Sequence, residues 1–322
     1  MITKTKSKYT WEGWESSGKE DWVFSVKHPC ELIGVHAKLI DAQLKESEKV
    51  EYCIYSPRVS STSTPFGLKA VESSSGVCVT DKRFIISNNK HIKGTEPTIT
   101  SINFEDILYF NVGSAMLLSW FSITYIQDRQ MKQLNILFSS NGKHHFAKAM
   151  RANKKYHHPI NTDDFVLDTP VPASFIHKIT DSIHRNYLKT LMSSGEKCIL
   201  TFSCQYIWGK AAEYKSLFGK KQSTYLTSKA TMLFTNKSLL IARNSLDFSI
   251  GNSLDIQLIP LEKVKSIFVG EENIDNQMIH KLGIDFVNND TLVFSLLSID
   301  EQVRIFLNNI SGLLESTKKE RY

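Results

Sequence analysis

The stretch that decides the fold is Gly76-Val77-Cys78-Val79-Thr80-Asp81-Lys82-Arg83-Phe84-Ile85-Ile86. Two apolar runs flank the polar residues Thr80-Asp81-Lys82, and this pattern predicts two strands joined by a tight turn. Short polar side chains in such turns bond back to the backbone. We therefore interpret Thr80 and Asp81 as structural residues rather than catalytic ones.

Further strand signals surround this hairpin. Residues Glu48 to Tyr55 alternate apolar with polar side chains, and Ile102 to Ile107 form another apolar-rich run. The run Leu134 to Phe138 leads to Asn141-Gly142. Asn-Gly next to an apolar run is typical of a β-hairpin turn. The first half of the chain is therefore predicted to be mainly β.

The same order of elements recurs in the second half. Matching runs are Glu196–Phe202, Met232–Ile241, Ile259–Val264 and Leu282–Phe286. The landmark pairs are Glu48 with Glu196, Thr80 with Thr235, Phe104 with Leu261 and Phe138 with Phe286. Four landmarks in one order, with small drifts that fall in loops, predict a tandem duplication.

Helices complete the predicted organisation. Apolar residues recur at helical spacing in Cys30–Leu44 after Pro29, and again in 175–191 and 299–314. We expect the last two to close the first and second copies, with the polar segment 151–168 as a linker. The predicted boundaries are an aromatic N-terminal arm and helix at 1–45, a first domain at 46–192 and a second at 193–322. The arm contains Trp11, Trp14 and Trp22 and is expected to pack onto a neighbouring sheet, with a partner-binding tail as the alternative.

These motifs resemble those of the bacterial pleckstrin-homology-like (PH-like) and GRAM-like families. Gly76–Ile86 carries the family's Thr-Asp-Lys-Arg turn, and Ile102–Ile107 carries the following Phe-x-Asp-Ile pattern. The second copy departs from the pattern at Asn236, Ser238 and Lys263. The resemblance implies two mainly β modules in tandem. Each would be a bent β-sandwich or half-open barrel closed by a C-terminal helix.

Composition narrows the function class. The chain has 322 residues, 41% hydrophobic and 22% charged, which is typical of a globular protein. Its formal charge of +6 is spread along the chain rather than concentrated, so we expect no nucleic-acid partner. The polar N-terminus and the short apolar runs predict no signal peptide and no membrane span. Five cysteines without CxxC spacing predict free thiols in a reducing compartment, hence a cytoplasmic protein.

No catalytic or cofactor motif is present, since GxGxxG, GxxxxGK[ST], HExxH and GxSxG are all missing from the sequence. The pairs His144-His145 and His157-His158 lack metal-ligand spacing, and we interpret them as parts of basic surface loops. We therefore expect a non-enzymatic protein without cofactor or metal.

One loop indicates an anionic ligand. The segment from Trp208 to Tyr225 interleaves lysines with aromatic residues, a combination that suits a phospholipid head group. The candidate ligand-binding residues are Trp208, Lys210, Lys215, Phe218, Lys220 and Lys221. The alternative is a solvated hairpin whose aromatic residues pack back on the sheet.

A second stretch, Met116–Ile123, is apolar in the first copy only. We predict a buried strand there, with a module interface or a homodimer patch as the alternative. The functional prediction is a binding or scaffold protein that contacts a protein partner through its two modules. Peripheral binding to anionic membrane lipids through Trp208–Tyr225 is the alternative.

Overall fold

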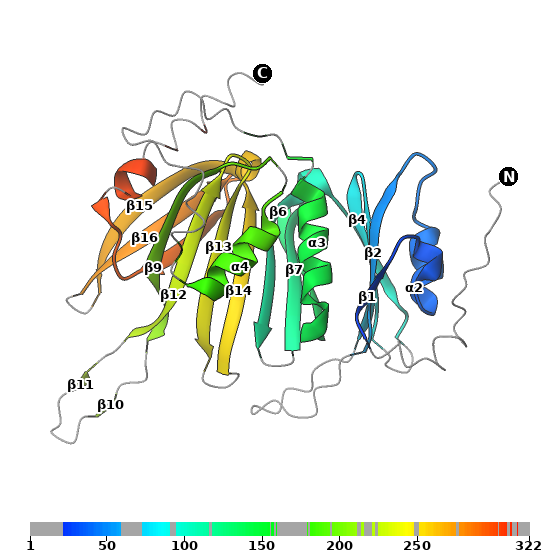
Figure 1. Ribbon diagram of the computed structural model, residues 1–322, viewed down its shortest axis with the longest axis horizontal. Coiled ribbons are helices and arrows are strands. Elements are labelled where there is room, and N and C mark those ends of the chain that lie inside the picture. The colour runs from blue at the N-terminus through cyan, green and yellow to red at the C-terminus, as the bar shows by residue number, and fades with distance from the viewer. Residues whose placement is uncertain are drawn as a thin grey trace. The chain divides into compact units, whose positions relative to one another are not determined.

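The computed structural model describes most of the chain, and its strands and helices are shown in Figure 1. The chain forms two compact units, Met1–Tyr156 and His157–Tyr322. The described residues are 22–58, 73–90, 95–115, 118–154, 156–157, 159, 179, 181–193, 195–210, 214–215, 221–222, 225–247, 251–274, 277–301, 303–307, 310 and 314. The fold is mainly β with few helices, as predicted.

The first unit begins with a five-stranded antiparallel sheet in the order β1-β2-β3-β4-β5. Its strands are β1 (Phe24–Val26), β2 (Val50–Ser56), β3 (Ser74–Thr80), β4 (Arg83–Asn89) and β5 (Thr98–Asn103). The predicted hairpin is confirmed, because β3 pairs with β4 from Val79 opposite Phe84 back to Ser74 opposite Asn89. Val77, Cys78, Val79 and their partners Phe84, Ile85 and Ile86 are fully buried.

A second antiparallel sheet follows a 3-10 turn, η3 (Phe104–Asp106). It contains β6 (Ile107–Ala115), β7 (Leu118–Gln127) and β8 (Gln130–Ser139). A further turn, η4 (Ser140–Gly142), leads directly into helix α3 (Lys143–Lys154). The predicted hairpin at Asn141-Gly142 is therefore wrong. Residues 146, 147, 149 and 150 are buried at helical spacing, and that burial outweighs the local turn preference.

Aromatic rings join α3 to both sheets of the first unit. The Phe146 ring centroid lies 4.1 Å from that of Phe138 on β8 and 5.1 Å from that of Phe121 on β7. Phe121 in turn lies 6.5 Å from Phe84 on β4. Each fully buried phenylalanine contributes roughly 1.5–3 kcal/mol. The helix thus covers the apolar interior between the sheets, the place that the resemblance implies for a closing helix.

The predicted helix over Cys30–Leu44 is shorter and interrupted. It consists of a 3-10 turn, η2 (Pro29–Glu31), and α2 (Val35–Asp41), separated at Gly34, whose φ is 60°. A residue with a side chain rarely adopts that angle, so glycine marks the break. Ile40 of α2 is fully buried and belongs to a cluster with Cys53, Cys78 and Ile85.

The second unit has the same series of elements. Its strands are β9 (Cys198–Lys210), β12 (Tyr225–Thr235), β13 (Ser238–Asp247), β14 (Gly251–Pro260), β15 (Val264–Ile274), β16 (Gln277–Phe286) and β17 (Thr291–Leu296), with η6 (Leu261–Lys263) before β15. They are ordered β15-β16-β17-β9-β12-β13-β14. A short pairing of Leu296 with Tyr206 joins β17 to β9. In the first unit the outer edge of β2 instead pairs with β1.

A C-terminal helix covers the second unit as well. Residues 301, 303–307, 310 and 314 are helical, and the backbone N–H of Arg304 donates to the Asp300 carbonyl. Phe306, Leu307, Ile310 and Leu314 are buried, and the Phe306 ring lies 5.5 Å from that of Phe234 on β12. The predicted closing helix after Ser298 is confirmed for these residues.

Helix α4 (Ser182–Leu191) differs from its predicted role. The sequence pattern assigned 175–191 to the end of the first copy, but α4 packs against β13 of the second unit. Leu188 and Leu191 are buried there, and the boundary between units lies after Tyr156 instead of at residue 192. In the first unit α3 already covers the apolar interior, with Phe146 and Met150 fully buried.

One predicted landmark pair was also misaligned. Phe138 was matched with Phe286, yet Phe138 lies on the last strand of its unit and Phe286 on the second-last. Tyr125 is the positional counterpart of Phe286, because Ile107 pairs with Tyr125 as Val264 pairs with Phe286. Strand lengths differ between the units, which a comparison by apolar spacing cannot detect.

Candidate functional site

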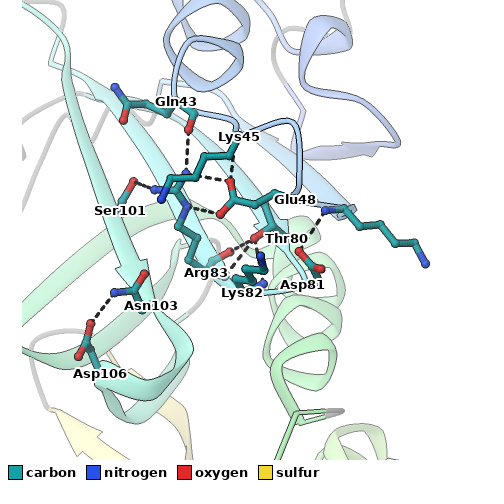
Figure 2. A network of polar contacts seen from close by, with 11 residues as sticks. Gln43, Lys45, Glu48, Thr80, Asp81, Lys82, Arg83, Ser101, Asn103 and Asp106 are labelled. Carbon is teal, nitrogen blue, oxygen red and sulfur yellow. Dashed lines mark hydrogen bonds and ion pairs between the residues drawn. The ribbon is translucent and has the colours of Figure 1, made fainter.

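The turn between β3 and β4 is built around the hydroxyl of Thr80 (Figure 2). Thr80 Oγ1 accepts hydrogen bonds from the backbone N–H groups of Lys82 (3.1 Å) and Arg83 (3.0 Å) and donates to the Arg83 carbonyl (3.2 Å). Asp81 Oδ1 accepts from the backbone N–H of Lys49 at 3.0 Å. This geometry supports the structural interpretation of Thr80 and Asp81.

Arg83 extends from this turn to a buried carboxylate. Its Nε and Nη2 atoms donate to Glu48 Oε1 (2.7 Å) and Oε2 (2.8 Å), and the two side chains are 10% and 2% exposed. Figure 2 shows the guanidinium also reaching the Gln43 carbonyl (2.8 Å) and Ser101 Oγ (3.3 Å). The hydrogen bond from Arg83 lowers the pKa of Glu48 below its ordinary value.

This cluster holds elements together. Gln43 and Glu48 precede β2, Arg83 begins β4 and Ser101 lies on β5, so one guanidinium joins three segments of the first unit. All three of its nitrogen atoms donate to protein acceptors. A guanidinium whose nitrogen atoms all donate to protein acceptors stabilises the fold, and we assign Arg83 no role in catalysis.

The second unit contains the same turn with different side chains. Thr235 Oγ1 accepts from the backbone N–H groups of Lys237 (3.2 Å) and Ser238 (2.9 Å), and Asn236 Oδ1 accepts from the backbone N–H of Lys197 (2.9 Å). The carboxylate of Glu196 takes the place of Glu48. Its Oε1 accepts from Thr235 Oγ1 (2.5 Å) and Ser238 Oγ (2.8 Å). Two hydroxyls thus occupy the position where the first unit has a guanidinium.

A buried histidine ties the helix that precedes each unit's main sheet to that sheet. His36 of α2 has its Nδ1 2.7 Å from Ser87 Oγ and its Nε2 2.9 Å from Ser74 Oγ. His184 of α4 has its Nδ1 2.9 Å from Thr231 Oγ1 and its Nε2 3.1 Å from Asn244 Oδ1. Sequence reasoning missed both. The signal was available, because the separation of His36 and His184 equals that of Glu48 and Glu196.

The outer face of α3 is basic. The helix sequence Lys143–Lys154 has six Lys, Arg or His residues and no acidic residue. His144 and Lys148 are exposed and Arg151 is partly exposed. The ammonium group of Lys148 lies 4.2 Å from the centre of the Tyr52 ring. The prediction of a basic surface loop at His144-His145 is corrected here: both residues belong to a helix.

His145 turns away from this face toward β2. Its Nδ1 lies 2.9 Å from Tyr52 Oη. Burial, with smaller effects from His144 and Lys148, lowers the pKa of His145 to about 4. The imidazole is therefore neutral at neutral pH, and His145 serves as a packed hydrogen-bonding partner of Tyr52.

The described candidate anion-binding residues lie on strand β9 and on a small two-stranded ribbon. Trp208 and Lys210 belong to β9, Lys215 to β10 (Tyr214–Lys215) and Lys221 to β11 (Lys221–Gln222). The backbones of Lys215 and Lys221 are register partners in the β10–β11 ribbon. Phe218 and Lys220 lie outside the described residues.

The apolar stretch Met116–Ile123 is for the most part strand β7. Phe121 and Ile123 are fully buried and Ser119 is buried, while Met116 and Leu117 lie outside the described residues. Leu118 to Ile123 pairs with β6 on one side and β8 on the other. The described part therefore agrees with the buried strand rather than the homodimer patch.

Among the residues that the structure describes, no group of three or more His, Cys, Asp or Glu side chains is arranged to hold a metal ion. His157 instead pairs with Glu262, Nδ1 to Oε1 at 2.8 Å. All five cysteines are free thiols. Cys53 and Cys78 face each other across β2 and β3, and a hydrogen bond with Cys78 together with burial raises the pKa of Cys53. None of these groups indicates catalysis.

Comparison with known proteins identifies one part of the chain. Residues 44–152 match the family model of the bacterial PH domain, so the first unit contains a PH-like domain. No curated protein sequence matches the chain. Among solved structures, the hSac2 domain from human phosphoinositide phosphatase Sac2 aligns at 16% identity and covers 48% of this chain and 87% of that one. Its TM-score of 0.28 is too low to show a shared fold.

No helix in the described ranges combines the length and the apolar character needed to span a bilayer.

Proposed function

We propose that the chain is a non-enzymatic binding or scaffold protein that contacts a protein partner through two PH-like modules in tandem. The observation that carries this proposal is the match of residues 44–152 to the bacterial PH domain family, and the binding role is inferred by analogy with that fold. The clusters of polar side chains in the described units support the non-enzymatic part, because the hydrogen bonds of Glu48, Arg83, Glu196, His36 and His184 all serve the fold.

The hydrogen bonds of the two turns support a second PH-like module. Asp81 N donates to the Lys49 carbonyl as Asn236 N donates to the Lys197 carbonyl, at 2.9 and 3.0 Å. Phe104 N donates to the Lys82 carbonyl as Leu261 N donates to the Lys237 carbonyl, at 3.0 and 2.9 Å. A shared ancestor explains such agreement in detail, whereas a chance likeness of two β units does not require it.

Affinity capture of the full chain, combined with chemical cross-linking and mass spectrometry, tests the proposal. We expect a partner protein in stoichiometric amount, with cross-links to lysines of both units. The control is Phe84→Asp, which places a charge at a fully buried position, so captures that survive in it are nonspecific. Affinity capture in which the full chain cross-links to no other protein would contradict a scaffold role.

Peripheral binding to anionic lipids through Trp208–Tyr225 is the second candidate. The ribbon register that sets Lys215 opposite Lys221 favours it, since two lysine backbones lie side by side. Pelleting with phosphatidylglycerol vesicles should be lost when Lys210, Lys215, Lys220 and Lys221 are replaced by Glu. A charge-matched control replaces the exposed lysines Lys38, Lys189, Lys229 and Lys265. Absence of pelleting by the unaltered chain would eliminate this candidate.

A further inference from the structure

The basic face of α3 distinguishes the two units. His144, Lys148 and Arg151 follow one another at four and three residues, so they form one stripe along the helix. We refer to these three residues as the α3 stripe. Lys148 and Arg151 carry like charges at neighbouring positions, which destabilises a helix by a few tenths of a kcal/mol. Helix α3 contains no acidic residue that could offset this repulsion.

In the corresponding helix of the second unit, the described cation Arg304 is paired with carboxylates of the same unit. Arg304 forms an ion pair with Glu271 of β15 and lies 3.6 Å from Glu301 of its own helix. In the described part of the first unit, no ion pair joins a carboxylate to His144, Lys148 or Arg151. The first unit therefore presents positive charge at a position where the second unit presents a closed pair.

Lys148 is held in place before any partner arrives. Its ammonium lies over the Tyr52 ring, and Tyr52 is itself fixed by its contact with His145 at 2.9 Å. A cation positioned over an aromatic ring gains roughly 0.5–1 kcal/mol at an exposed site. Restricting a lysine side chain in advance also lowers the entropy lost on binding.

We propose that the α3 stripe docks an acidic, Asp- or Glu-rich segment of a partner protein. This inference rests on the proposed function and names the surface and chemistry of its protein contact. Charge complementarity supports it, and so does the length of the stripe. The seven residue steps from His144 to Arg151 span about 10 Å along the helix, which an extended peptide covers in about three residues.

Because the large apolar residues of α3 are buried, the α3 stripe is better suited to bind a protein segment than a membrane. Helices that bind bilayers place large apolar side chains beside their basic residues, where they enter the interface. The large apolar residues of α3, Phe146 and Met150, are fully buried in the core of the first unit. The stripe therefore offers charge without an apolar face to insert.

Fluorescence anisotropy of the full chain with a labelled glutamate-rich peptide tests the inference. Lys148→Gln with Arg151→Gln should weaken binding about fivefold, the effect of losing two exposed ion pairs. Lys189→Gln with Lys229→Gln removes the same charge from exposed positions of the second unit and should leave affinity within about twofold. The charge-retaining variant, Lys148→Arg with Arg151→Lys, should bind like the unaltered chain.

Several results would overturn the inference. The first is that the Lys148/Arg151 and Lys189/Lys229 glutamine variants lose affinity to the same extent. The second is that a glutamine-rich peptide binds as tightly as the glutamate-rich one. The third is that the charge-retaining variant no longer binds. Pelleting with phosphatidylglycerol vesicles that depends on Lys148 and Arg151 would also overturn it, in favour of a membrane surface. Should peptide binding fail while cross-linking still captures a partner, the scaffold proposal stands and only the α3 stripe is excluded as its docking surface.

Discussion

Glu48 and Arg83 lie 35 residues apart in sequence and form a two-point ion pair, with Nε–Oε1 and Nη2–Oε2 distances of 2.7 and 2.8 Å. Both side chains are almost completely buried. Removing one partner of such a pair leaves the other charge buried and unmatched. The stability of the first unit should therefore depend strongly on it.

Arg83→Ala is expected to lower the free energy of unfolding by about 3–5 kcal/mol. Denaturant unfolding monitored by circular dichroism measures the change. Lys132→Ala serves as the control, because Lys132 pairs with Asp128 at the surface and should cost less than about 1 kcal/mol. Equal effects of the two substitutions would show that the buried pair does not stabilise the fold.

The same pair predicts an acid-dependent loss of stability. Arg83 lowers the pKa of Glu48 from its ordinary value of 4.5, so the folded state binds the proton less well than the unfolded state. The stabilisation is complete above pH 4.5 and is lost as the pH falls through the lowered folded-state pKa. The difference in unfolding free energy between the unaltered chain and Glu48→Gln should thus shrink below pH 4.5. A difference that stays constant with pH contradicts this linkage.

Thr80→Val should destabilise the chain by about 1–3 kcal/mol at nearly constant volume. The substitution removes the acceptor of the Lys82 and Arg83 backbone N–H groups, and Arg83 lies in a buried part of the turn. Thr190→Val is the matched control, since the Thr190 hydroxyl is exposed and bonds only within α4. Thermal unfolding of both variants gives the comparison, and a lower melting temperature in the control alone would argue against the role of Thr80.

Two strand glycines provide a further matched pair. A Cβ added at Gly113 of β6 would lie 2.0 Å from the Trp120 ring, whereas one at Gly270 of β15 would meet nothing within 4 Å. Gly113→Ala must displace the indole and should cost about 1–3 kcal/mol. Gly270→Ala should be neutral or slightly stabilising. Adding Trp120→Ala should remove most of the cost at Gly113, and a double-mutant cycle would detect the coupling.

Sequence-based predictions were correct where the preferences of the turn residues agreed with the burial pattern of the flanking residues. At Thr80-Asp81-Lys82 the turn residues and the flanking apolar runs require the same hairpin, and the hairpin is present. At Asn141-Gly142 they disagree, because the dipeptide favours a hairpin while the following residues bury Phe146 and Met150 at helical spacing. The burial of these side chains outweighed the turn preference of Asn141-Gly142, and the segment is helical.

The parts missed by sequence reasoning depend on contacts between distant residues. Of the α3 stripe, His144 was predicted to lie in a surface loop and Arg151 in a linker, because the Asn-Gly turn signal was given more weight than the helical spacing of the apolar residues after it. The histidines of α2 and α4 were overlooked because a lone histidine on a helix has no motif. His184 also shows why α4 was assigned to the wrong copy: its partners Thr231 and Asn244 lie far ahead in the sequence.

The replacement of Arg83 by Ser238 shows what the turns of the two units require. Their backbones share a turn bond for bond, while the residue that reaches the buried carboxylate changes from a cation to an alcohol. Residue identity at this corner therefore differs between the two units, and the match to the bacterial PH domain covers residues 44–152. A main-chain turn of this kind tolerates either a guanidinium or a hydroxyl beside its buried carboxylate, so the backbone path does not depend on which side chain donates to the carboxylate.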